Sequence, residues 1–209
     1  MRSLLPLACT VALLGLGPLA QAGTVFSNIT QTQSPGWAVN GADINYGEQD
    51  VAAEFTTSGA VVMSGTSVFV DGFYEAPATF NETLYSNVNG KPGAVVASLA
   101  DDLSADVGYS LVNASGLSVA LAADTSYWLV LTPFDANSEL GWTFDGDPSV
   151  NVDWNDKYDG FSGWHAETMD NSVQFAIYDT TAATPEPSSL ALLGTGILGI
   201  AGLVRLRLA

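Results

Sequence analysis

An acidic segment in the last third of the chain contains the side chains whose types and spacing could best support chemistry. Asp145, Asp147, Asn151, Asp153 and Asn155 follow one another at short intervals. Calcium is bound by about six to eight oxygens, which clustered carboxylates, amides and turn carbonyls supply. The spacing departs from an EF-hand loop, and the same residue types are ordinary turn formers in a solvated acidic loop. Both interpretations stay open. Calcium is the candidate cofactor, and its expected ligands are Asp145, Asp147 and Asp153.

Large aromatic side chains lie in and just after the same segment. Trp154, Tyr158 and Trp164 are candidates for stacking on sugar rings, with neighbouring Asp and Asn side chains as hydrogen-bond partners for hydroxyls. Such an arrangement would make a carbohydrate-binding face, with exopolysaccharide as its partner. The alternative is that these rings pack into the core of the domain, as large rings commonly do.

Residues for nucleophilic catalysis are scarce. His165 is the only histidine, and the chain has no G-x-S-x-G motif. A glycosidase needs only two carboxylates, but their abundance in this chain does not by itself indicate a pair across a cleft. The sequence therefore predicts a protein that is not an enzyme and has no catalytic residues, with a β-sandwich glycosidase as the remaining catalytic alternative.

The charge of the chain excludes one class of partner. The 209 residues contain 22 acidic against 5 basic side chains, and the formal net charge is −17. Three of the bases lie near the two ends, so residues 23–184 carry 21 acids against Lys91 and Lys157, a net charge of −19. Such a domain repels phosphate backbones, which excludes nucleic acid as a partner.

The elements that must position these side chains are strands. Between residues 23 and 184, apolar and polar residues alternate with a period of two, and turn-forming clusters bound the alternating stretches. We predict an all-β domain, an antiparallel β-sandwich of jelly-roll type. Its expected strands are 24–29, 51–57, 61–70, 79–85, 94–99, 108–113, 118–121, 126–132, 141–144 and 172–178.

Residues 1–22 have the pattern of a secretory signal peptide. Arg2 supplies the positive start, residues 4–19 are mostly apolar, and Ala20 and Ala22 form an A-x-A site before Gly23. A retained membrane anchor is the alternative, and the two prolines and the small residues at the cut argue against it. The mature chain would then begin at Gly23 and contain no cysteine, so its core must hold the fold without a disulfide.

Residues 185–209 form a second targeting segment. Pro185-Glu186-Pro187 precedes the uncharged apolar stretch 190–204, which Arg205 and Arg207 follow. As a single hydrophobic helix this stretch would be roughly 22 Å long, which is short for a hydrocarbon core of about 30 Å. It predicts a helix that anchors the chain in the inner membrane with its arginines in the cytoplasm. A permanent anchor and a tail that is recognised and then cut are the two alternatives.

This combination of Pro185-Glu186-Pro187, a Leu- and Gly-rich helix and terminal arginines resembles the PEP-CTERM sorting signal. The resemblance covers residues 184–209. It implies export by a bacterium that makes exopolysaccharide, transient anchoring in the membrane, and cleavage by an exosortase, a membrane-embedded cysteine transpeptidase. The expected function is that of a secreted, non-enzymatic component of the extracellular matrix or cell surface. A carbohydrate-binding module of the matrix is the first alternative.

Two blocks of the body carry a second resemblance. The first extends from Leu84 to Leu99 through the turn Lys91-Pro92-Gly93, and the second is the stretch 121–131 with its Tyr127-Trp128 pair. Both are similar to the choice-of-anchor class of secreted bacterial β-domains, type R, which occurs with interchangeable C-terminal sorting tails. The resemblance implies a fold and an extracellular address, and it implies no catalytic residue.

Overall fold

The computed structural model describes residues 23–44, 47–73, 77–156, 163–166 and 172–180. The expected signal peptide, the hydrophobic tail and Tyr158 lie outside these residues, so the structure does not bear on them. Over the described ranges, no helix has the length and apolar character that a membrane span requires.

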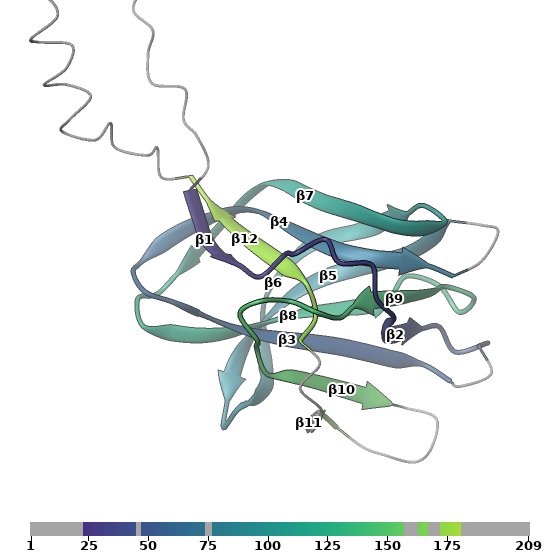
Figure 1. The fold of residues 1–209 in the computed structure, drawn as a ribbon. Helices are drawn as coiled ribbons and strands as arrows, with labels where there is room; N and C mark the ends of the chain where they lie inside the picture. Colours follow the sequence, from purple (N-terminus) through teal and green to yellow (C-terminus); the bar gives the residue numbers. More distant parts are fainter. Residues whose placement is uncertain (1–22, 45–46, 74–76, 157–162, 167–171, 181–209) are drawn as a thin grey trace, which may run out of the picture.

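Within these ranges the regular structure consists of strands (Figure 1). The bounds of the strands are β1 (Gly23–Ser27), β2 (Gly36–Asn40), β3 (Gln49–Thr57), β4 (Val61–Gly72), β5 (Ala78–Val88), β6 (Lys91–Ala105), β7 (Gly108–Leu121), β8 (Thr125–Pro133), β9 (Glu139–Thr143), β10 (Val152–Asp156), β11 (His165–Ala166) and β12 (Phe175–Asp179).

These strands form one open sheet in the order β1-β12-β4-β9-β2-β3-β8-β5-β6. Outside that path, β7 pairs with β4, β10 pairs with β3, and β11 pairs with β10. All these pairs are antiparallel. The all-β, antiparallel part of the predicted fold is confirmed.

The sheet curls around a single large core. Phe55 of β3 and Phe175 of β12 are 6.2 Å apart between ring centroids, although their strands are far apart in the sheet order. Phe26 of β1 lies 4.8 Å from Phe175, and all three rings belong to one hydrophobic cluster. We call the side of each strand that faces this cluster inner and the opposite side outer.

Several strands differ from the prediction. The strands β2, β10 and β11 were not expected, and the predicted strands 108–113 and 118–121 are parts of the single strand β7. The acidic segment is therefore not a loop throughout, because residues 152–156 pair with β3. Pairing buries Asp153, which is 1 % exposed, and this corrects the interpretation of the whole segment as solvated.

The two ends of the domain lie together. Gly23, the first residue of β1, is opposite Asp179, the last residue of β12, and Figure 1 shows both strands side by side. The strand β12 also pairs with β4 on its other side. The last strand before the tail is thus held on both sides by the domain.

Candidate functional site

The short strand β10 separates the predicted site residues onto two faces of the sheet. Asp153 pairs with Ala52, whereas Trp154 pairs with Val51. Val51 belongs to the main core and Ala52 to a smaller cluster on the other face. Since neighbouring residues in a strand point to opposite faces, Trp154 lies on the inner side and Asp153 on the outer side.

Trp154 contacts other rings rather than an open surface. Its ring centroid is 6.5 Å from that of Trp37, with the planes nearly parallel, and 5.0 Å from that of His165 on β11. Trp37 in turn packs edge-on against Phe144. This row of rings closes the margin of the core, which supports a packing role for Trp154.

Trp164 lies on the outer face. It packs with Tyr85 against the buried cluster of Ala52, Trp128 and Val130, and its ring is 6.4 Å from that of Tyr85. The Nζ of Lys91 donates a hydrogen bond to the carbonyl oxygen of Trp164 over 2.7 Å. These contacts hold the segment 163–166 against the sheet.

Polar side chains of β3, β5 and the approach to β10 surround this cluster. The carboxylate of Glu54 accepts hydrogen bonds from the amide nitrogens of Asn87 and Asn151. The Oδ2 of Asp153 and the Nε1 of Trp128 are buried, and neither has a hydrogen-bond partner within the described part of the chain. Buried polar atoms without partners are uncommon in proteins.

Burial raises the pKa of Asp153 to about 6. The positive charge of Lys91 opposes this rise, the carboxylate of Glu54 adds to it, and His165 opposes it slightly. A fraction of Asp153 is therefore protonated near neutral pH and able to donate as well as accept a hydrogen bond. Asp153 and Trp164, predicted for two different sites, thus share the outer side of the same sheet margin.

The three predicted calcium ligands are not brought together. Asp145 and Asp147 are exposed in the segment between β9 and β10, whereas Asp153 is buried on β10. No three histidine or acidic side chains of the described ranges gather into a group that could hold a metal. The carbonyl oxygen of Asp145 already accepts a hydrogen bond from Thr30 Oγ1. These side chains alone do not form a calcium cage, and calcium binding stays a prediction.

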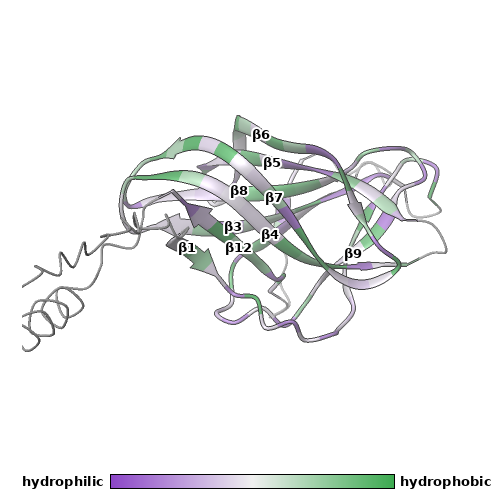
Figure 2. Ribbon diagram, turned by 90° about the horizontal axis from the view of Figure 1, so that it is seen from above, coloured by the Kyte–Doolittle hydropathy of each residue, from purple (hydrophilic) through white to green (hydrophobic). Residues whose placement is uncertain are grey.

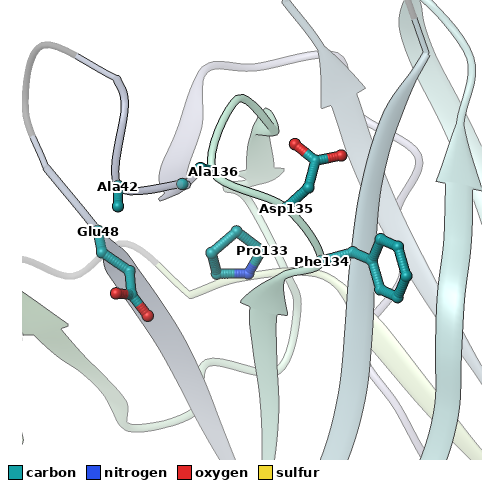
Figure 3. Close-up of a pocket in the computed structure, with 7 residues that line it drawn as sticks. Ala42, Glu48, Pro133, Phe134, Asp135 and Ala136 are labelled. Carbon is teal, nitrogen blue, oxygen red and sulfur yellow. The ribbon is translucent and has the colours of Figure 1, made fainter.

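A pocket of about 200 Å³ lies where two loops meet (Figure 3). Pro133 is at its centre, with Glu48 on one side and Phe134 and Asp135 on the other. The backbone N–H of Asn137 lowers the pKa of Asp135, and the hydroxyl of Thr79 acts in the same direction. Asp135 is thus ionised, and each of its two carboxylate oxygens already accepts a hydrogen bond. The sequence did not suggest this pocket, because loop residues far apart in the chain line it.

The comparison with protein families concerns the tail alone. The model of the PEP-CTERM protein-sorting motif matches residues 183–207. The match contains the predicted sorting residues Pro185, Glu186, Pro187, Arg205 and Arg207. No curated protein matches the chain. The motif indicates a secreted protein of the cell envelope that an exosortase processes.

Proposed function

We propose that this chain is a non-enzymatic component of the extracellular matrix or cell surface, linked to exopolysaccharide and released from a transient membrane anchor by an exosortase. The sorting motif at residues 183–207 is the observation that supports this proposal most directly. The tail 190–204 holds the exported chain in the inner membrane, with Arg205 and Arg207 on the cytoplasmic side. The signal peptide 1–22 starts the export and is removed before Gly23.

The positions of the domain ends suit this processing. Asp179 closes the described β12, and Pro185 follows it by six residues. Six residues span at most about 20 Å when fully extended. The acidic domain therefore stays close to the membrane while the motif is uncut, and cleavage near Pro185 frees it from that surface.

We further propose that the curled sheet is a two-layer sandwich of jelly-roll type, as the choice-of-anchor resemblance implies. The only residue pair between β2 and β3 is Asn40 with Gln49, so the described sheet is weakly joined at this corner. Thr66 of β4 also donates a hydrogen bond to Glu82 of β5 across the interior. These contacts support two layers, one with β4 and β12 and the other with β3 and β5.

The absence of an enzymatic role is part of the proposal. His165, the single histidine, lies against the ring of Trp154. Asp153 and Glu54 are carboxylates of the same sheet margin, but Glu54 is occupied by two asparagine amides and Asp153 is covered. Incubating the protein with the exopolysaccharide of its host tests this, because new reducing ends would reveal hydrolysis.

Replacing Pro185-Glu186-Pro187 by three alanines should leave nearly all of the chain uncut in the membrane fraction of a host that has an exosortase. The physical reason is that the hydrophobic stretch remains inserted unless the enzyme recognises the segment before it. Immunoblots of membrane and medium fractions measure the ratio of uncut to processed chain. The matched control replaces Ser188 and Ser189 by alanine and should be processed normally. Equal processing of the motif variant would refute the sorting role.

A further inference from the structure

The outer face of β4 and its neighbours presents a set of side chains that the core does not use. In β4, Val68 and Val70 point into the core, so Phe69 and Asp71 between and after them point outward. Across the β4–β7 pair, Phe69 is opposite Leu111, and Asp71 is opposite Tyr109. Figure 2 looks onto this side and shows apolar segments alternating with paler ones on β7.

Three exposed side chains, with one buried ring packed against them, form what we call the aromatic face: they are Phe73, Tyr109 and Leu111, and the buried ring is that of Phe69, which is 6 % exposed. Phe73, Tyr109 and Leu111 are 40 %, 37 % and 41 % exposed. The rings of Phe69 and Tyr109 are stacked 6.2 Å apart. The ring of Phe73 lies against Gly141 of β9, where an added Cβ would be only 2.6 Å from it. Apolar surfaces of this kind mark interaction sites.

Polar groups suited to binding hydroxyls border the aromatic face. The hydroxyl of Tyr109 hydrogen-bonds the carboxylate of Asp71. On the same side, the hydroxyl of Ser67 donates to Asn113 Oδ1 over 2.5 Å and contacts the hydroxyl of Tyr178 at 3.3 Å. The side chains are thus held in place before any ligand arrives, which lowers the entropy cost of binding.

The charge of this side excludes anionic ligands. Lys91 is the only basic side chain within the described ranges, and it is engaged with Trp164 on the other layer. Asp71 contributes an acidic group to the aromatic face through its contact with Tyr109, and the whole body carries a net charge of −19. A polyanion would be repelled, whereas an uncharged polymer with hydroxyls and apolar ring faces would not.

We propose that the aromatic face binds a neutral polysaccharide chain that lies along β4 and β7. The exposed rings stack on the apolar faces of sugar rings, and Asp71 and Asn113 hydrogen-bond their hydroxyls, while the buried hydroxyl of Ser67 holds Asn113 in place. The inference rests on the proposed matrix function, for which it names the partner. This proposal places sugar binding away from Trp154 and Trp164, whose partly buried rings pack against other rings of the domain.

The test is retention of the uncut, full-length chain in mild detergent on cellulose and on immobilised dextran, with immobilised alginate as the anionic probe. We expect retention on at least one neutral probe and none on alginate. Tyr109→Ala and Phe73→Ala should each weaken retention roughly tenfold, which is typical of exposed anchor rings. Tyr109→Phe keeps the aromatic ring and should weaken retention less than Tyr109→Ala does. Phe134→Ala, the control at a ring that is at least as exposed and lies outside the aromatic face, should leave retention unchanged.

Three results would overturn the proposal. They are failure of both neutral probes to retain the chain, retention on alginate, and an equal loss in Phe134→Ala and Tyr109→Ala. Circular dichroism of each variant shows whether a loss of retention comes from unfolding. If the alanine variants are unfolded, the retention of Tyr109→Phe relative to the native chain decides whether the proposal holds. Because the uncut chain is used, the result does not depend on exosortase processing, so this proposal and the sorting role fail separately.

Discussion

Gln174→Leu should lower the free energy of unfolding by about 4 kcal/mol. Gln174 is fully buried immediately before β12, and its side chain connects two other segments. Its Oε1 accepts hydrogen bonds from the backbone N–H groups of Thr30 and Gln31, and its Nε2 donates to the carbonyl oxygens of Thr32 and Phe144. Leucine fills a similar volume but leaves these four backbone groups without partners, at about 1 kcal/mol or more each.

Denaturant unfolding followed by tryptophan fluorescence measures this loss. Gln33→Leu is the matched control, because Gln33 is exposed in the same segment and its replacement should change the free energy by less than about 0.5 kcal/mol. Gln174→Glu should also destabilise, because a carboxylate cannot donate to the carbonyls of Thr32 and Phe144. A Gln174→Leu variant as stable as Gln33→Leu would show that the network does not hold the segment.

Glu82→Gln should make the protein more stable at slightly alkaline pH and remove part of its pH dependence. Glu82 is fully buried on β5, its Oε2 accepts a hydrogen bond from Thr66, and its Oε1 has no partner within the described ranges. Burial raises the pKa of Glu82 to about 7 from 4.5, and the Thr66 hydrogen bond only partly opposes this. The folded state therefore favours the protonated carboxyl.

The sign of the effect follows from that shift. Because the pKa is higher in the folded than in the unfolded chain, the contribution of Glu82 to stability is complete below pH 4.5 and is lost as the pH rises through about 7. The shift corresponds to a loss of up to about 3 kcal/mol. The pKa of Asp153 is also raised, so its contribution to the stability of the protein is lost in the same direction. Only the difference between the native chain and Glu82→Gln therefore isolates the effect of Glu82.

Unfolding free energies from about pH 5 to about pH 8 measure this difference. The native chain should lose stability over this range, and Glu82→Gln should lose less, with the gap widening toward alkaline pH. Asp101→Asn removes an exposed carboxylate and should follow the native chain. Parallel curves for the native chain and Glu82→Gln would contradict a buried, protonated Glu82.

Strands with strong alternation were predictable from the sequence. The expected strand 126–132 is β8 (Thr125–Pro133) with small changes at its ends. Leu129 and Leu131 belong to the main core, whereas Trp128 and Val130 belong to the outer cluster. A strand that is buried on both faces reads in the sequence as a continuous apolar run rich in β-forming residues. The bounds predicted from the sequence therefore differ little from those of the folded strand.

Other strands depended on contacts that the sequence does not display. Within β7, Gly116 has a positive φ of 76° and lies where the register with β4 shifts. The sequence predicted two separate strands, 108–113 and 118–121, but the glycine between them forms a bulge after which the strand continues. Likewise, β10 was hidden among turn-forming residues, and its pairing with β3 is a long-range contact.

The candidate sites were harder to predict than the strands. Glu82 alternates in phase with Phe80 and Leu84, both in the core, and this pattern was the available signal for a buried carboxyl. The aromatic face combines residues of β4, β7 and the segment after β4, which only the sheet topology brings together. The sorting motif was predictable because its recognition depends on a short contiguous segment.

The mass of the intact protein recovered from its native host tests the sorting claim most directly. The predicted mass is that of a chain that begins at Gly23 and ends near Pro185-Glu186-Pro187, without the hydrophobic stretch 190–204. A protein recovered with residues 190–207 still attached would contradict exosortase processing.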